Sequence, residues 1–430
     1  MGAIYDIDGN EIIIDRDIPE PEPRTIDISG IPYIHFIGTL PTDKNQEALG
    51  VQFVFGNNTE RINGYATLKV QGNSTTAYPK KNFTLKLFTD KAHKKKYKIA
   101  FNDWGEQNKF VLKADWIDIS HARNIVSARL WSDVVASRDS YDTLPELYRK
   151  SPNNCMVDGF IVKIFANGVY QGRYSFNIPK DPWMFNMDDS LDTHAVLCGE
   201  DYVSSCFRAS AKLDGTDWTD EMHEDNPPQL IKTRWNQVIS FVRTSSDTDF
   251  VTNINSYINL ESLIDYYIFA YVDCGLDALG KNQIYLTYDG NLFYASMYDM
   301  DSTWGLYWNG SKFVSPEYRM QEDYEVGVHN TSNLLFNRLV QLFPTAIKTR
   351  YNALRRGVLS EAYIKDRFKE WCDISSPELV AMDYAPETAG GAFSNIPQKT
   401  TNNYEQLSTF ITARLAYVDS KIAELAGGGS

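Results

Sequence analysis

The sequence predicts an α+β fold with a β-dominated N-terminal lobe and a mainly helical C-terminal lobe. Short runs rich in β-branched and aromatic residues, separated by turn residues, occupy residues 30–115. Apolar residues at helical spacing dominate the chain after a predicted hairpin at residues 281–305. Because the strands come first and the helices later, the order favours an α+β fold.

The first 28 residues are predicted to form a separate arm. The segment "IYDIDGNEIII" is a candidate hairpin around Asp8-Gly9, because this dipeptide favours a two-residue turn. The following "PEPEPR" predicts a stiff, extended linker. We expect residues 1–28 to dock onto a neighbouring subunit rather than to fold alone.

Residues 29–182 are predicted to form the β-rich lobe. Its strands include "GVQFVFG", "INGYATLKVQG" and "KNFTLKLF". In "DISHARNIVSARLWSDVVASR" the apolar residues change to helical spacing, which predicts a helix. A hairpin follows in "DGFIVKIFANGVYQGRYSFNIP", around Asn167-Gly168, and this is the strongest short hairpin signal in the chain.

Residues 183–425 are predicted to form the C-terminal lobe. Residues 183–230 are polar and rich in turn residues, so we expect loops with limited structure, including a solvated acidic loop at 217–225. The segment "INLESLIDYYIFAYVDCG" predicts a helix that Gly275 can end. Helices are predicted again after the hairpin at 281–305, and residues 426–430 are expected to be a flexible tail.

Composition limits the possible function classes. The 430-residue chain carries a formal net charge of −14, so it lacks the basic surface expected of a nucleic-acid-binding protein. The basic run "KAHKKKYK" fits a solvated strand edge, and it could also meet phosphate or an acidic partner. The chain shows no membrane-spanning segment and no signal peptide pattern. We expect a protein that is cytoplasmic when made, either free or incorporated into a phage virion or another particle.

Acidic residues stand where the hairpin at 281–305 ends. In "YDMDSTWG", Asp299 and Asp301 directly follow an apolar run, where core sequence avoids charge. Asn282 opens the first strand of the hairpin, and Asp277 lies just past the preceding helix. Since a hairpin brings the start of its first strand beside the end of its second, we expect these four side chains to converge.

Converging carboxylates repel one another unless a cation lies between them. Oxygen ligands favour a hard ion, Mg²⁺ or Mn²⁺, and Mg²⁺ commonly leaves positions open for phosphate oxygens, which points to phosphoryl transfer. The spacing leaves two alternatives open, a structural Ca²⁺ site and ordinary acidic residues of a surface turn. The five cysteines contain no CxxC pair and the six histidines no metal-binding spacing, so a zinc site is not predicted.

A small-residue loop in the β-rich lobe is a candidate phosphate site. The loop from Gly72 to Thr76 joins two strands, and its backbone amides could face a phosphate. Lys80 and Lys81 follow it, although the Walker A pattern is absent. An ordinary hairpin loop with edge lysines is the alternative. The candidate phosphate ligands are Gly72, Asn73, Ser74 and Lys81.

Several stretches, in order from about residue 30 to 375, resemble the CotH-type kinases, which are atypical protein kinases named for a spore coat protein. "QGNSTTAYPKKNFTLKL" is similar to the family's small-residue loop with its "PKKS" and the next strand. "KFVLKADWIDISHARNIVSARLW" resembles the Asp turn and the "RN"-bearing helix, and "NGVYQGRY" resembles the "NGxYxGxY" hairpin. The stretch from Ser262 to Gly305 resembles the helix, the Asp-to-Asn segment and the "WDxD…G" end.

The resemblance implies a kinase-like two-lobed fold that uses ATP and a divalent metal to phosphorylate Ser or Thr. By position, Asp277 matches the aspartate of the catalytic region, and Asn282 matches the asparagine shortly after it. Asp299 and Asp301 match the "WDxD" pair, of which at least one would ligate the metal. Lys81 matches the second lysine of "PKK", a candidate for the nucleotide phosphates.

Two further matches and two departures complete the resemblance. Arg123 and Asn124 match the "RN" pair of the family's helix, for which we expect a supporting structural role. Tyr298 stands where the family has Trp, and Asn82 stands where it has Ser. Both departures are mild, because every acidic position is kept.

The leading hypothesis is therefore a CotH-like kinase that transfers the γ-phosphoryl group of ATP to Ser or Thr of a protein, with Mg²⁺ or Mn²⁺ as the metal. The alternative is a structural component of a phage tail, virion or other particle that uses the same scaffold, with or without activity. A third hypothesis is a carbohydrate- or Ca²⁺-binding β-rich module. The expected partners are a protein substrate or, through residues 1–28, neighbouring particle subunits, with no nucleic acid.

Overall fold

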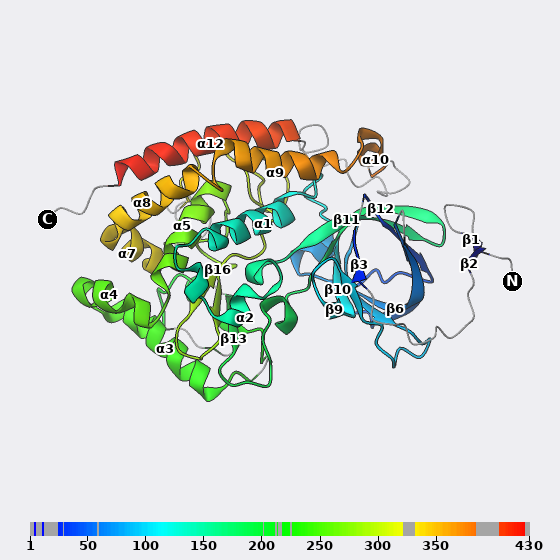
Figure 1. Ribbon diagram of the computed structural model, residues 1–430, viewed down its shortest axis with the longest axis horizontal. Coiled ribbons are helices and arrows are strands. Elements are labelled where there is room, and N and C mark those ends of the chain that lie inside the picture. Colours follow the sequence, from blue (N-terminus) through cyan, green and yellow to red (C-terminus); the bar gives the residue numbers. More distant parts are fainter. Residues whose placement is uncertain are drawn as a thin grey trace. The chain divides into compact units, whose positions relative to one another are not determined.

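The computed structural model describes residues 4–5, 11–12, 25–28, 30–57, 60–200, 202–210, 213, 217–223, 226–320, 332–383 and 404–425. The chain forms two compact units, each built from separate stretches of sequence (Figure 1). The division predicted from the sequence, with an arm at 1–28, lobes at 29–182 and 183–425 and a tail at 426–430, stays a prediction. Unit 1 comprises Met1–His121, Asp158–Pro179 and Trp371–Lys399, and unit 2 comprises Ala122–Val157, Lys180–Glu370 and Thr400–Ser430.

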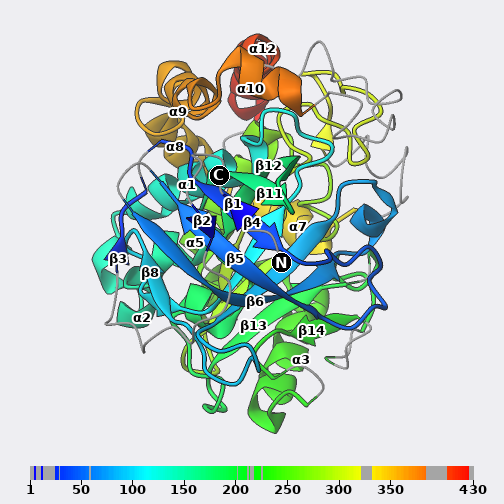
Figure 2. The same cartoon turned by 90° about the vertical axis from the view of Figure 1, so that its right-hand side faces the viewer.

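The predicted α+β class is confirmed, with a seven-stranded barrel in the N-terminal part and mostly helices in the C-terminal part. Around the barrel the order is β10-β12-β11-β4-β5-β6-β7. Figure 2 labels β12, β11, β4, β5 and β6 of this barrel. Strands β4 and β11 pair in parallel, and the other neighbours are antiparallel. Closure leaves the barrel without a free edge. The barrel strands are β4 (Tyr33–Ile37), β5 (Leu49–Gly56), β6 (Arg61–Gln71), β7 (Asn82–Phe88), β10 (Lys109–Lys113), β11 (Gly159–Ala166) and β12 (Val169–Asn177).

Aromatic rings form a large part of the core of unit 1. The ring centroid of Phe176 lies 4.8 Å from that of Phe110, 4.9 Å from that of Phe160 and 5.0 Å from that of Phe101. All four rings are buried, so the aromatic content of the sequence is used for packing here. Phe101 comes from a small separate sheet with the order β3-β8-β9. Its strands are β3 (Thr25–Ile26), β8 (Ile99–Phe101) and β9 (Glu106–Gln107).

The predicted hairpin around Asn167-Gly168 is confirmed, and the two short strands on either side of Asp8-Gly9 pair with each other. Asn167 and Gly168 join β11 to β12 with φ angles of 49° and 83°, and the type I′ turn needs such positive values at both positions. In the N-terminal arm, β1 (Ile4–Tyr5) pairs antiparallel with β2 (Glu11–Ile12). Residues 6–10, where the Asp8-Gly9 turn is predicted, the proline-rich linker and residues 426–430 lie outside the described residues.

A buried polar network within unit 1 ties the segment after helix α9 (Glu361–Asp373) to the barrel. Asp383 accepts hydrogen bonds from Arg173 Nε at 2.6 Å and from the Tyr170 hydroxyl at 2.8 Å. Arg173 Nη1 donates to Ser375 Oγ at 2.9 Å. Burial alone would raise the pKa of Asp383, but the positive charges of Lys80 and Arg173 hold this pKa at about 2. Asp383 is also the C-cap residue of α10 (Pro377–Met382) in the same unit.

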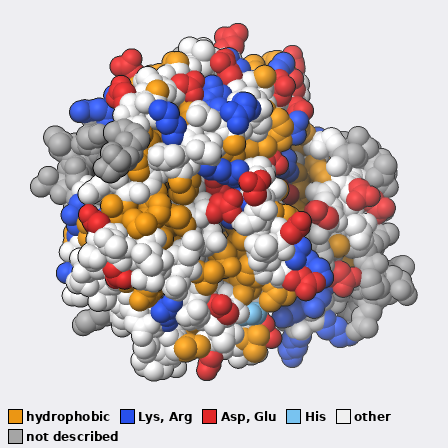
Figure 3. All heavy atoms as spheres, turned by 60° about the vertical axis from the view of Figure 1, so that its left-hand side comes forward, with side chains coloured by type: hydrophobic (Ala, Val, Ile, Leu, Met, Phe, Trp, Pro, Cys, Tyr) orange, Lys and Arg blue, Asp and Glu red, His pale blue; other side chains and the backbone are white. Residues whose placement is uncertain are grey.

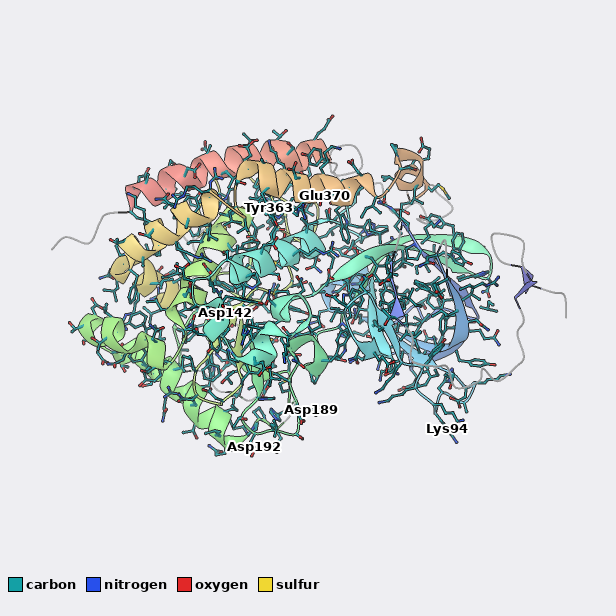
Figure 4. The ribbon with its side chains drawn as sticks, viewed as in Figure 1. Lys94, Asp142, Asp189, Asp192, Tyr363 and Glu370 are labelled. Atoms are coloured by element: carbon teal, nitrogen blue, oxygen red, sulfur yellow. The ribbon has the colours of Figure 1, made fainter. Side chains whose placement is uncertain are left out.

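Unit 2 is built around helix α5, which is buried along nearly its whole length because its sequence is apolar or aromatic on most sides. The C-terminal helix α12 packs against α5 and α8 (Figure 1). Tyr363 lies on α9 (Figure 4), and its hydroxyl donates to Asp133 Oδ2 of α1 at 2.9 Å. The helices of unit 2 are α1 (Arg123–Ala136), α2 (Glu146–Arg149), α3 (Gln229–Thr244), α4 (Asp247–Asn253), α5 (Leu260–Asp273), α7 (Leu334–Leu342), α8 (Pro344–Arg355), most of α9, and α12 (Tyr404–Glu424).

A four-stranded sheet with the order β14-β13-β15-β16 forms the other part of unit 2. Its strands are β13 (Ala195–Gly199), β14 (Trp218–Asp220), β15 (Ile284–Thr287) and β16 (Tyr294–Ser296). The expectation of limited structure at residues 183–230 is therefore wrong for β13 and β14. These strands are too short to show an alternation of apolar and polar residues. Their pairing with β15 and with each other joins residues far apart in the sequence. Their burial is completed by Trp235, whose ring lies 4.8 Å from that of Trp218.

The surface of the protein is mixed in character. Figure 3 shows one face on which Lys and Arg side chains lie among Asp and Glu, with hydrophobic side chains exposed between them. Apolar atoms contribute a large share of the accessible surface of folded proteins, so exposed hydrophobic side chains are expected. Among the described residues, no helix combines the length and the hydropathy needed to cross a bilayer.

Candidate functional site

The hairpin that carries the predicted acidic site is present. Strands β15 and β16 pair antiparallel, with Ile284 opposite Ser296. The same register continued by two residues would place Asn282 opposite Tyr298. The ladder stops before that point, because Asn282 and Asp299 both adopt left-handed backbone conformations, with φ angles of 57° and 56°. Asp299 and Asp301 therefore do not share a strand face, as they would have if the strand had continued.

Asp277 and Asp299 lie close enough for their charges to interact. Asp277 follows α5 in a turn in which the backbone N–H of Lys281 donates to the Asp277 carbonyl at 2.7 Å. Burial, followed by the negative charge of Asp299, raises the pKa of Asp277 to about 6, and Lys281 opposes this shift. The carboxylate of Asp299 belongs to an exposed residue. Of the four side chains expected to converge, Asp277 and Asp299 thus lie near each other.

Helix α1 holds the backbone of the acidic turn. Asn124 Oδ1 accepts a hydrogen bond from the backbone N–H of Met300 at 3.1 Å. Arg123, which is fully buried, donates from Nε to the carbonyl of Thr303 at 3.0 Å. The two residues expected to give structural support thus both hold the turn that contains Asp299 and Asp301.

Helix α5 and Trp304 close the other end of the turn. The backbone N–H of Trp304 donates to the carbonyl of Asp273 at 2.5 Å, and Trp304 Nε1 donates to Ser127 Oγ at 2.8 Å. Trp304 is completely buried and has a φ angle of 51°. The acidic turn is therefore held between α1 and the end of α5, and its backbone conformation depends on both helices.

The donor set suits a hard cation. The negative charge of Asp299 acts on the buried Asp277, a positive ion nearby would offset such negative charge, and oxygen donors match Mg²⁺ or Mn²⁺. Across the described part of the chain, no group of three or more His, Cys, Asp or Glu side chains is assembled for a metal. The predicted ligand set of Asn282, Asp299 and Asp301 contains only two carboxylates, and it stays a prediction. Asp301 is half-buried in the turn after Asp299.

The small-residue loop lies between β6 and β7, as predicted, and contains a single turn of 3₁₀ helix at Ser74–Ala77. Gly72 has a φ angle of 108°, and a Cβ atom there would lie 2.0 Å from Thr75 Oγ1. Only glycine fits this position without rearrangement. Asn73 is exposed, and its Oδ1 accepts a hydrogen bond from Lys44 Nζ at 2.7 Å.

The two lysines after the loop have different positions. Lys81 Nζ donates to the carbonyls of Thr76 and Tyr78 at 2.7 and 2.6 Å, so it stabilises the loop itself. Lys80 is directed into the network of unit 1, where Nζ donates to the carbonyls of Ala114 and Arg173. Burial lowers the pKa of Lys80 to about 8. Whether Lys81 and the loop bind phosphate stays a prediction.

The expected departures from the family pattern are accommodated. Asn82, which replaces the family's Ser, accepts from the backbone N–H of Ala114 at 2.7 Å and donates to Thr75 Oγ1 at 3.3 Å. Tyr298, which replaces the family's Trp, lies beneath the ammonium of Lys180, with Nζ 4.5 Å from the ring centroid.

No pattern in the sequence predicted which residues surround Tyr298. Lys180 Nζ forms an ion pair with Glu221 Oε1 at 2.8 Å and lies 3.7 Å from Cys198 Sγ. Glu221 belongs to the stretch expected to be a solvated acidic loop. That expectation is wrong for Glu221, which pairs with Lys180, and for Asp220, which is fully buried. No spacing in the sequence connects these residues, because a sheet of distant strands brings them together.

Taken together, the fold and the site define an α+β protein with a carboxylate pair at a hairpin end, suited to a hard cation. A model of the family described as CotH kinase protein matches residues 68–418. The chain therefore belongs to the CotH kinase protein family, which confirms the resemblance in the sequence. Membership suggests kinase activity and implies the use of ATP. None of the curated proteins compared with the chain matches it.

Proposed function

We propose that the protein is an ATP-dependent protein kinase that transfers the γ-phosphoryl group to a Ser or Thr hydroxyl of a protein. Family membership supports the reaction class. The observation that carries the assignment of the site is the pKa of Asp277, which burial and the nearby Asp299 raise to about 6. A carboxylate with this pKa is ionised near neutral pH and is still basic enough to accept a proton.

In this proposal, Asp277 accepts the hydrogen bond, and then the proton, of the acceptor hydroxyl. The hydroxyl oxygen forms the new bond to the γ-phosphorus, and the bond from that phosphorus to the bridging oxygen of the β-phosphate breaks. ADP leaves with the electron pair of the broken bond, and Asp277 later releases its proton to solvent. Positioning of the hydroxyl is the main requirement, because phosphoryl transfer depends on alignment and charge stabilisation.

Asn282, Asp299 and Asp301 are the residues proposed to hold Mg²⁺ or Mn²⁺. When bound, the metal neutralises negative charge on the phosphate groups. The exposed carboxylate of Asp299 and its interaction with Asp277 support this assignment. The hydrogen bond from Met300 to Asn124 fixes the peptide between the two aspartates, so their spacing is set by α1.

Gly72, Asn73, Ser74 and Lys81 are proposed to bind the phosphates of the nucleotide. The Lys81 ammonium has three donors, and two of them hold the loop carbonyls of Thr76 and Tyr78. The third donor is the one proposed for phosphate. The left-handed conformation at Gly72 turns the chain sharply at the start of the loop.

The test uses the full chain with labelled ATP and Mg²⁺, its own hydroxyls and casein serving as acceptors. Asp277→Asn and Asp301→Asn should each reduce incorporation of label to near background. Asp189→Asn is the matched control, because Asp189 is an exposed loop residue (Figure 4) and no role is assigned to it. Equal incorporation by all four proteins, or none by the wild type, would contradict the proposal.

The expectation that residues 1–28 contact neighbouring subunits of a phage virion or another particle stays a prediction. Particle fractionation of cells that express the full chain, beside a chain lacking residues 1–28, tests it directly. Recovery of both proteins only in the free fraction would argue against the particle hypothesis, and it would leave the kinase proposal intact.

A further inference from the structure

We infer that Lys180 is a positioning residue for Asp299 and that it acts through the aromatic ring of Tyr298. The inference rests on the proposed function, because it concerns how the acidic turn holds its metal-binding carboxylate. Lys180 Nζ lies 4.5 Å from the centroid of the Tyr298 ring, and Tyr298 immediately precedes Asp299 in the chain. A cation over the face of an aromatic ring is attracted by the negative charge density of that face.

Lys180 is itself held firmly. Glu221 Oε1 accepts from its ammonium at 2.8 Å, and Cys198 Sγ lies at 3.7 Å on strand β13. The side chains of Lys180 and Glu221 are only 20% and 24% exposed, so solvent screens their charges incompletely. Burial alone would lower the pKa of Lys180, but Cys198, Tyr298 and Glu221 together raise it. The ammonium is therefore charged throughout the neutral pH range.

The turn needs such support because Asp299 has an unfavourable backbone conformation. Its φ angle of 56° lies in the left-handed region, which a non-glycine residue adopts at a cost of about 1 kcal/mol or more. The residues on both sides of Asp299 are held. Asn124 accepts from the backbone N–H of Met300 on one side, and Lys180 covers the ring of Tyr298 on the other.

This arrangement gives a role to the tyrosine that replaces the family's tryptophan at position 298. A tyrosine ring retains the negative face on which a cation rests, although the attraction is weaker than over an indole. An aliphatic residue would fill similar space without that attraction. The pair of Lys180 and Tyr298 therefore predicts that aromatic character at position 298, rather than bulk, keeps Asp299 in place.

A double-mutant cycle on the full chain tests the inference, with Lys180→Met, Tyr298→Leu and the combined variant. The readout is the affinity for Mn²⁺ alone, measured by electron paramagnetic resonance, which needs no turnover. Each single substitution should weaken Mn²⁺ binding about tenfold, and the double variant should be no weaker than the single ones. Lys180→Arg and Tyr298→Trp should bind Mn²⁺ as the wild type does.

Three results would overturn the inference. The first is additive losses of Mn²⁺ affinity in the cycle, which would mean that Lys180 acts independently of Tyr298. The second is coupling in urea unfolding without coupling in Mn²⁺ affinity, which would make the contact merely structural. The third is a wild type that binds no Mn²⁺, and this result would remove the proposed metal site as well. Additive losses with an intact wild-type site would leave the kinase proposal standing.

Discussion

Asn124 accepts a hydrogen bond from the backbone N–H of Met300, at 3.1 Å, across 176 positions of the sequence. Met300 is the residue between the two aspartates of the acidic turn, and Asn124 lies in the first turn of α1. Together with the bond from Arg123 to Thr303, this contact makes the start of α1 the scaffold of the acidic turn. The conformation of the turn should therefore be sensitive to substitutions in α1.

Asn124→Ala should reduce both stability and activity. It removes the acceptor and leaves the N–H of Met300 unpaired, so the free energy of unfolding should fall by about 1–2 kcal/mol in urea titrations. Incorporation of label from ATP should fall more than the loss of folded protein explains. Asn124→Asp is the control, because it keeps an oxygen acceptor of the same shape. Wild-type activity in Asn124→Ala would show that the turn does not need this contact.

The rate of phosphoryl transfer should rise with pH through an apparent pKa of about 6, the value for Asp277. Below this pH, Asp277 is protonated and cannot accept a proton from the substrate. Asp299→Asn removes the negative charge that helps to raise this pKa. The rise of the variant's residual activity with pH should therefore occur at a lower pH than in the wild type. The pH profiles of kcat/KM check this shift, because they report on the free enzyme. A rise that stays at the wild-type pH after Asp299→Asn would contradict the assignment.

Asp277→Asn should stabilise the protein near neutral pH. The pKa of Asp277 is higher in the folded state than its ordinary value of 3.8, so the folded protein binds this proton more tightly than the unfolded chain. The free energy of unfolding of the wild type therefore falls as the pH rises from 3.8 to about 6, where Asp277 ionises. The amide side chain of the variant does not ionise, so the variant does not lose this stability. We expect the free energy of unfolding to increase by about 1–2 kcal/mol near neutral pH.

The same substitution should have little effect in acid, where Asp277 is protonated in both states. Urea titrations of the wild type and of Asp277→Asn near neutral pH and below pH 4 make the comparison. An equal difference in stability at both pH values would show that ionisation of Asp277 is not the cause.

Gly72→Ala should destabilise the small-residue loop more than Gly168→Ala destabilises its hairpin. Both glycines have positive φ angles, 108° and 83°, so both substitutions introduce backbone strain. Only at Gly72 would the new Cβ atom also collide with Thr75 Oγ1, at 2.0 Å, whereas nothing lies within 4 Å at Gly168. We expect losses of roughly 2–3 and 1 kcal/mol respectively in the free energy of unfolding.

Gly72→Ala should also raise the KM for ATP if the loop binds phosphate, and Gly168→Ala should leave the KM unchanged. Equal stability losses in the two variants would show that the loop relaxes around the new methyl group. An unchanged KM in a folded Gly72→Ala protein would count against the loop as a phosphate site.

Asp383→Asn should destabilise the protein strongly near neutral pH. The substitution leaves the buried guanidinium of Arg173 without its carboxylate, a loss typically of about 3 kcal/mol. The pKa of Asp383 is lowered to about 2, so its contribution to stability is present above the ordinary value of 3.8 and is lost as the pH falls towards 2. The difference between variant and wild type should therefore narrow in acid.

Asp419→Asn provides the comparison for Asp383→Asn, because Asp419 pairs with Arg355 while its own side chain is 46% exposed. Asp419→Asn should lower the free energy of unfolding by less than about 1 kcal/mol. Similar losses for the two variants in urea titrations would show that the network of unit 1 contributes no more than a surface ion pair.

Local patterns in the sequence predicted much of the fold. The turn chemistry of Asn167-Gly168 depends only on which residues tolerate positive φ angles, and the hairpin formed there. The apolar stripe of α5 and the hairpin of β15 and β16 were likewise visible, since each depends on neighbours close in sequence. Strands β13 and β14 were missed because their burial comes from distant partners.

By itself, the sequence determined the α+β class, the membership of the CotH kinase protein family and the approach of Asp277 to Asp299. The class and the approach of the two aspartates follow from periodicity, turn residues and the geometry of one hairpin, whereas the family follows from the resemblance of several motifs in order along the chain. Only the tertiary structure decided what holds the site. Asn124 accepts a hydrogen bond from Met300, the Lys180 ammonium lies over the ring of Tyr298, and Lys81 donates hydrogen bonds to carbonyls of its own loop. Long-range packing selects these partners of the polar side chains. Spacing along a chain carries no information about such partners, since folding brings together residues that no local pattern connects.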